Sequence, residues 1–221
     1  MYTLYHGSEK IIREPKYGIG NIKNDYGQAF YCTQIKELAC EWAVTESRNG
    51  YCNIYDFQNE GLNGLNLMDD NYQILNWLAI LLDNRTFKLN STIATSAKKY
   101  IIENFLPDYR KYDYIRGYRA DDSYFSFANV FLNNGLSLEK LSEAMRLGDL
   151  GEQIAICTPK AFDKIKYVDS MEVSRIDFYP LKKSRDDMAR LKYQEMKDDI
   201  TEGTYILDII RQKWRNRDVR I

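Results

Sequence analysis

The chain has 221 residues, 44% of them hydrophobic and 29% charged, which is enough for one domain with a buried core and a solvated surface. Its 31 basic and 32 acidic residues leave a net charge of -1, which excludes a general electrostatic attraction for nucleic acid or an anionic membrane. The first residues lack the basic start and apolar run of a signal peptide, and the longest apolar stretch, around Leu75 to Leu82, is too short to cross a bilayer. We therefore expect a soluble, cytoplasmic protein.

Short β-forming runs and helical patterns follow one another along the chain. We expect strands at residues 1–6, 30–32, 51–57, 65–68, 112–115 and 153–157, and a mostly extended segment at 167–178. We expect one helix after an N-cap at Thr33 and a strongly apolar helix that follows caps at residues 69–71 and ends at Leu82. Further helices are expected at residues 91–105, 137–147, 159–165, 185–197 and 201–214. Residues 125–132 fit either a strand or the start of a helix.

These elements do not follow a strict strand–helix–strand alternation, which favours an α+β fold with a largely antiparallel or mixed sheet and flanking helices. No Gly-x-Gly-x-x-Gly sequence follows a strand, and the P-loop sequence is absent, so neither a Rossmann domain nor a P-loop nucleotidase is supported. The composition shifts from Ser184 onward. We expect a main domain at residues 1–180 and a helical C-terminal appendage at residues 181–221, packed on the same domain.

The cysteines and the histidine bear on metal binding. None of the four cysteines belongs to a Cys-x-x-Cys pair, and all have apolar neighbours in the sequence, which indicates reduced thiols in the core. Because His6 is the only histidine and no ligands cluster in the sequence, we expect no metal site.

Two residues in the N-terminal part of the chain are the first candidates for ligand binding. His6 stands beside Gly7 at the end of the first expected strand, where a backbone can approach a ligand closely. Either His6 makes a hydrogen bond to a ribose hydroxyl or an amide, or it is a buried histidine with a partner inside the protein. Tyr31 lies in a segment, residues 27–31, that leads from a glycine into a strand. Its ring either faces a flat heterocycle or packs in the core.

Two pairs of neighbouring polar residues are further candidates. Asp121 and Asp122 follow a strand, where they form a metal or substrate site or cap the next element. Glu152 and Gln153 start a strand, and alternation places them on opposite faces, so at most one points into a given pocket. A carboxylate there can stabilise a developing oxocarbenium charge, or it is an exposed glutamate at the edge of a sheet.

The last charged segment contains Arg185-Asp186-Asp187, Arg190 and Lys192, and basic residues return at 213–217. This segment is either a solvated helix face or a surface for a partner or a nucleic acid.

The order of these segments resembles a known superfamily. Tyr5-His6-Gly7-Ser8, then Asp25-Tyr26-Gly27-Gln28-Ala29-Phe30-Tyr31-Cys32-Thr33, and much later Glu152-Gln153-Ile154-Ala155-Ile156 look like the histidine–tyrosine–glutamate arrangement of the ADP-ribosyltransferase superfamily, in the branch of poly(ADP-ribose) polymerases and diphtheria toxin. The chain resembles still more closely a bacterial family of unknown function assigned to that superfamily, in these segments and in Ala120-Asp121-Asp122. The resemblance covers roughly residues 1–170 and implies a split mixed or antiparallel sheet.

The resemblance also implies roles for the residues. His6 would bind the nicotinamide ribose of NAD, the backbone of Gly7 would bind the nicotinamide amide, and Tyr31 would stack on the nicotinamide ring. Ser8, Thr33, Asp121 and Asp122 are expected beside the same cofactor. The third catalytic position is Glu152 if the chain is aligned with the polymerases and Gln153 if it is aligned with the bacterial family. Glutamine supplies no negative charge and is a poor general base.

The activity implied is an NAD-dependent ADP-ribosyl transfer, with NAD as a substrate and a protein or nucleic acid as the acceptor. The mechanism is dissociative, because the nicotinamide–ribose bond lengthens before the acceptor attacks. The protein would then be a toxin or defence effector, with an antitoxin or another small protein as a possible partner. The alternatives are a catalytically weak module that binds a nucleotide or a partner, and a structural protein in which His6 and Tyr31 are core residues.

Overall fold

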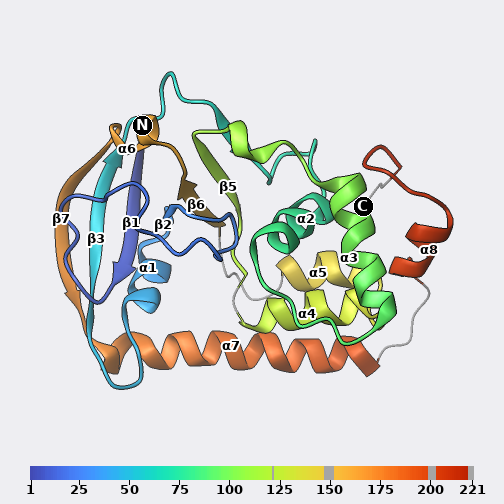
Figure 1. Ribbon diagram of the computed structural model, residues 1–221. Helices are drawn as coiled ribbons and strands as arrows, with labels where there is room; N and C mark the ends of the chain where they lie inside the picture. Colours follow the sequence, from blue (N-terminus) through green and yellow to red (C-terminus); the bar gives the residue numbers. More distant parts are fainter. Residues whose placement is uncertain (121, 147–151, 199–202, 219–221) are drawn as a thin grey trace.

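The computed structural model describes residues 1–120, 122–146, 152–198 and 203–218 of the chain. The elements form an α+β fold of two sheets with flanking helices, which confirms the expected fold class (Figure 1). None of the described helices is both long and apolar enough to cross a membrane.

Both sheets contain antiparallel pairs, and one of them also contains a parallel pair. The first sheet has the order β1-β3-β7 and is entirely antiparallel, with β1 at Tyr2–Ser8, β3 at Gly50–Phe57 and β7 at Ile165–Val173. The second sheet has the order β2-β6-β5-β4, with β2 at Phe30–Cys32, β6 at Glu152–Ile156, β5 at Tyr114–Tyr118 and β4 at Gly64–Asn66. In this sheet only β4 and β5 pair in parallel. An antiparallel bridge between Tyr5 and Thr33 connects β1 to the end of β2 and so links the sheets.

The helices cover different parts of the two sheets. Helix α1 (Lys36–Ala43) packs on β1 and β3. A group of helices lies beyond the second sheet: α2 (Ile74–Asn84), α3 (Thr92–Phe105), α4 (Asp122–Leu132), α5 (Leu138–Arg146) and α8 (Ile206–Arg211) (Figure 1). Helix α7 (Arg175–Asp198) starts at the end of the first sheet and runs below α1 to this group. Two short helices, α6 (Pro159–Phe162) and a 3-10 turn at Tyr109–Lys111, lie in connections.

Strand β6 shows how the core is divided between the two sides of the second sheet. Ile154 and Ile156 pack with residues of the first sheet, whereas Ala155, on the opposite face, packs with the helices. The alternation follows from the two-residue period of a strand. Each fully buried large apolar side chain in these clusters stabilises the fold by about 1.5–3 kcal/mol. Gln153 shares the face of Ala155, and Glu152 shares the face of Ile154.

Three expectations about the elements need correction or completion. Residues 125–132 are helical and belong to α4, which settles the open choice. The N-cap of α1 is Ile35 rather than Thr33, whose hydroxyl instead accepts a hydrogen bond from the Ile35 N–H at 3.1 Å. The segment expected to be extended as far as residue 178 leaves the sheet at Val173, and α7 begins at Arg175 instead of residue 185. Pro180 lies inside α7, so the proline does not mark a helix boundary as it usually does. The division into domains at residue 180 stays a prediction.

Candidate functional site

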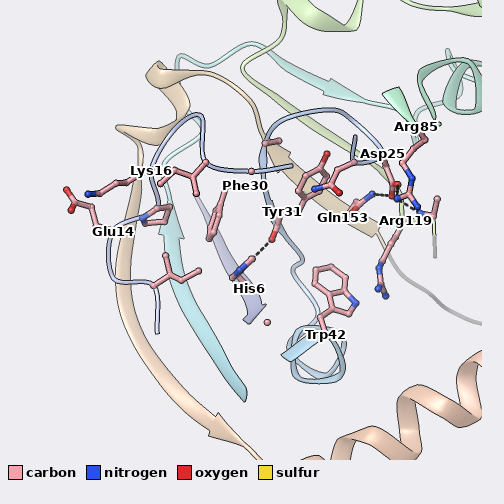
Figure 2. Close-up of a pocket in the computed structure, with 18 residues that line it drawn as sticks. His6, Glu14, Lys16, Asp25, Phe30, Tyr31, Trp42, Arg85, Arg119 and Gln153 are labelled. Carbon is pink, nitrogen blue, oxygen red and sulfur yellow. Dashed lines mark hydrogen bonds and ion pairs between the residues drawn. The ribbon is translucent and has the colours of Figure 1, made fainter. Parts of the chain in front are cut away.

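A cavity of about 650 Å³ lies where β1, β2 and β6 approach α1 and the long connection between β1 and β2 (Figure 2). His6 and Phe30 lie on one side of it, and Asp25, Gln153, Arg85 and Arg119 lie on the other (Figure 2). Cavities of this volume are the usual size of small-molecule sites. The expected residues His6, Gly7, Tyr31 and Gln153 all line it.

His6 is held by the backbone of the neighbouring strand. Its Nδ1 lies 2.6 Å from the carbonyl oxygen of Tyr31, and its ring centroid lies 4.4 Å from that of Phe30. A carbonyl oxygen only accepts, so Nδ1–H donates and Nε2 carries the lone pair of the neutral ring. Burial lowers the pKa of His6, and the hydrogen bond to Tyr31 opposes this shift. His6 is therefore a neutral hydrogen-bond acceptor within β1, which continues to Ser8 rather than ending at His6.

Gly7 and Ser8 differ in their relation to the cavity. Gly7 lines it, and the backbone of α1 crosses so closely that a Cβ atom at Gly7 would lie 1.9 Å from the carbonyl oxygen of Ala39. Ser8 does not line the cavity. Its hydroxyl donates to the carbonyl of Lys10 at 2.6 Å and accepts from Asn53 Nδ2 at 3.0 Å. Gly7 thus permits the close packing of α1 on β1, and Ser8 orders the start of the connection that follows.

Tyr31 presents its ring to the cavity and uses its hydroxyl inside the protein. The hydroxyl donates to the carbonyl of Gly27 at 2.6 Å and accepts from the N–H of Tyr26 at 3.1 Å. Gly27 has a φ of 80°, a left-handed conformation that favours glycine, and the two hydrogen bonds close the turn around it. Thr33 is fully buried in the bridge to Tyr5 and does not line the cavity, so its place as a cofactor contact is not supported by the geometry.

The open choice between Glu152 and Gln153 has a clear geometric answer. Gln153 lines the cavity and is buried, whereas Glu152 points to the opposite face of β6 and forms an ion pair with Arg116. Glu152 is therefore not positioned to act on a ligand in this cavity.

The buried carboxylate of the cavity is Asp25, which the sequence interpretation did not single out. Asp25 is only 5% exposed, and its carboxylate accepts hydrogen bonds from Gln153 Nε2 at 2.8 Å and from the Ala120 N–H at 2.9 Å. Arg85 forms an ion pair with it at 2.9 Å. Burial raises the pKa of Asp25, and these three partners oppose that shift. Asp25 belongs to the Asp25-Tyr26-Gly27 segment, but only its distant partners identify it as a site residue.

The remaining expected acidic residues lie partly outside the described structure. Asp121 is outside the described residues. Asp122 is the first residue of α4, and its side chain is also outside what is described. The adjacent Ala120 does line the cavity, through the backbone N–H that binds Asp25.

Trp42 and Arg119 form a second wall that the sequence interpretation missed. The guanidinium carbon of Arg119 lies 4.8 Å from the centroid of the Trp42 ring, which is a cation–π contact. Trp42 Nε1 is buried and has no hydrogen-bond partner among the described residues. A buried N–H without a partner is a donor that a ligand can satisfy. Within the described part of the chain, no group of three or more His, Cys, Asp or Glu side chains is arranged to hold a metal ion.

These features define an α+β protein with a cavity between two sheets, whose polar groups come from distant segments of the chain. The family model described as "Protein of unknown function (DUF3990)" matches residues 2–167, and the chain belongs to that family. The matched residues include every residue described above as lining the cavity and end before α7. No curated protein and no solved structure matches the chain.

Proposed function

We propose that this protein binds a nicotinamide dinucleotide in the cavity and acts on it as an ADP-ribosyltransferase-like protein. The observation that supports this proposal is the convergence of His6, Tyr31 and Gln153 on one cavity. These are the positions at which the resemblance to ADP-ribosyltransferases implies the ribose contact, the nicotinamide stack and the third catalytic position.

The cavity walls suit the parts of such a ligand. Nε2 of His6 accepts a hydrogen bond from a ribose hydroxyl, and the ring of Tyr31 offers a flat apolar face to nicotinamide. Trp42 Nε1–H supplies a donor without a partner among the described residues. Together these groups recognise a sugar and a heterocycle.

The chemical step needs negative charge near the reacting carbon. The bond between the nicotinamide nitrogen and ribose C1′ breaks, nicotinamide leaves with the electron pair, and C1′ becomes cationic. An acceptor then donates an electron pair to C1′ and gives its proton to a base or to water. Because Glu152 points away and Gln153 is neutral, we assign the stabilising charge and the base to Asp25.

A binding module without turnover is the second candidate. It is favoured by the ion pair between Asp25 and Arg85, since that pair partly neutralises the one buried carboxylate among the described lining residues. Such a protein would bind the dinucleotide and transfer nothing.

The test incubates the protein with NAD labelled in its adenylate part and a cell lysate, and measures nicotinamide release and labelled acceptor. We expect Asp25→Asn to lower both rates by about 100-fold, the usual effect of removing a group that stabilises transition-state charge. Glu152→Gln is the matched control, because it removes the carboxylate next to Gln153 on β6, which lies outside the cavity. It should retain the wild-type rates.

The remaining outcomes separate the two candidates. If NAD raises the melting temperature of the wild type but releases no nicotinamide, the binding module is correct. If NAD neither reacts nor stabilises the protein, both candidates are wrong.

A further inference from the structure

A second cavity, of about 440 Å³, adjoins the first, and Arg85, Arg119 and Ala120 line both. Its other walls come from α1 and from the first half of α7, which passes beside the site (Figure 2). Six basic side chains line it: Arg85, Arg119, Lys182, Lys183, Arg185 and Arg190. We call this cavity the basic chamber.

The described carboxylates around the basic chamber are fewer than its basic side chains. Its lining contains two carboxylates, of which Glu41 holds Arg185 at 2.9 Å and Asp186 holds Arg190 at 2.9 Å. Arg85 is held from the side of the first cavity by Asp25. Among the described lining residues, basic side chains therefore outnumber carboxylates, although the whole chain carries a net charge of -1.

The lysines on α7 account for much of this excess. Lys182 is half-buried and donates from Nζ to the carbonyl of Val44 at 3.0 Å. Lys183 is exposed on the adjoining part of the wall. Neither lysine forms an ion pair with a described residue. Both positive charges thus lie beside the basic chamber without a carboxylate in ion-pair contact among the described residues.

Arg119 adds a fixed positive charge at the passage between the two cavities. Its contact with the Trp42 ring holds the guanidinium group in place. Burial lowers the pKa of Lys182, and the positive charge of Arg119 lowers it further, whereas Glu41 opposes the shift. Like charges that lie so close together in a cavity are stabilised when an anion binds between them.

We propose that the basic chamber binds a phosphate group. Ammonium and guanidinium groups bind phosphate through charge-assisted hydrogen bonds, and a cavity lined by one sign of charge concentrates such anions. The phosphate belongs either to the molecule that occupies the first cavity or to a separate phosphate ester that reaches the passage at Arg119. This proposal does not depend on ADP-ribosyl transfer, because it rests on a different set of side chains.

The location of the basic chamber bears on its role. The α7 residues that line it lie beyond residue 167, where the family match ends, whereas the first cavity lies within the match. The phosphate site thus joins a cavity within the family match to a helix outside it. It also gives a role to the charged segment around residues 185–190.

The test measures binding of inorganic pyrophosphate to the full chain by calorimetry at low ionic strength. We expect the wild type to bind, and the double variant Lys182→Met with Lys183→Gln to bind about tenfold more weakly. Lys183→Gln alone should also weaken binding, and it leaves the fold intact because Lys183 is exposed and makes no hydrogen bond with a described residue. Lys166→Gln is the matched control, since it removes an exposed lysine at the opposite end of β7 from α7.

Two results overturn the proposal: no binding of pyrophosphate to the wild type, or equal affinity in the wild type and the double variant. A competition arm identifies the source of the phosphate. Pyrophosphate that displaces NAD indicates the diphosphate of the dinucleotide itself, whereas simultaneous binding indicates a separate phosphate ester. If NAD does not bind at all, the proposed function fails while the pyrophosphate measurement still decides the basic chamber.

Discussion

Gln153 donates a hydrogen bond from Nε2 to Oδ2 of Asp25 over 2.8 Å, and this bond joins β6 to the connection before β2 across 128 residues of sequence. The same nitrogen lies 3.2 Å from the carbonyl of Tyr118 on β5. Gln153 therefore supplies a neutral donor to a buried carboxylate, which a glutamate at this position could not do in its ionised form. The arrangement explains why glutamine is compatible with a buried carboxylate at this site.

Gln153→Glu should destabilise the protein at neutral pH, because it places a second carboxylate against Asp25. We expect a loss of about 3 kcal/mol, comparable to leaving a buried charge without compensation. The two carboxylates raise the pKa of the pair in the folded state above its unfolded value, so the folded state binds more protons. Stability should then rise as the pH falls through that range. Urea unfolding at several pH values measures this.

Gln153→Met is the control for that experiment. It removes the same hydrogen bonds without adding charge, so its stability relative to the wild type should change much less with pH. If Gln153→Glu and Gln153→Met show the same pH dependence, the carboxylate of Asp25 does not face residue 153 as described.

Gly7→Ala tests the close approach of α1 to β1. Because the added Cβ would lie 1.9 Å from the carbonyl oxygen of Ala39, the helix or the strand must move. We expect a loss of about 3 kcal/mol, at the upper end of the usual cost of overpacking. Thr3→Ala, at an exposed position of the same strand, should change stability by less than about 0.5 kcal/mol. Equal thermal stability of Gly7→Ala and the wild type would contradict the described packing.

Tyr31 allows the ring and the hydroxyl to be tested separately. Tyr31→Phe keeps the ring in the cavity but removes the hydroxyl that holds Gly27 and Tyr26, so we expect a loss of about 1–2 kcal/mol in stability. Under the proposed function this variant should still bind NAD when folded, whereas Tyr31→Leu should bind it at least about tenfold more weakly. Thermal unfolding and NAD titration measure the two effects. Unchanged NAD affinity in Tyr31→Leu would refute the stacking role of the ring.

Local patterns predicted most of the strands and the first part of the site. The alternation around residues 153–157 placed Glu152 and Gln153 on opposite faces, and the structure separates them in this way. The helical nature of residues 125–132 was harder to predict, because Phe and Val favour strands. Phe127, Ala128 and Phe131 are nevertheless buried at helical spacing.

The features that local patterns missed depend on contacts between distant segments. The role of Asp25 depends on Arg85, Ala120 and Gln153, and none of them is near it in sequence. Similarly, nothing near Trp42 indicates that Arg119 lies over its ring. Helix α7 was expected to start at residue 185 because the composition shifts at Ser184, whereas the helix begins at Arg175 and continues through Pro180. Tertiary contacts decide each of these cases.

His6 gives the last prediction, and the assignment is direct because the chain has no other histidine. Burial lowers its pKa below the ordinary histidine value of 6.5, so nuclear magnetic resonance titration should show the ring neutral at pH values where a free histidine is already half-protonated. The nitrogen spectrum should show the proton on Nδ1, which donates to the Tyr31 carbonyl.

Since the folded state binds fewer protons than the unfolded state, His6 should reduce stability as the pH falls below 6.5. His6→Gln should remove this dependence. A pKa at or above 6.5 would contradict the described burial of the ring. A proton on Nε2 in the neutral form would show that the hydrogen bond to the Tyr31 carbonyl is absent.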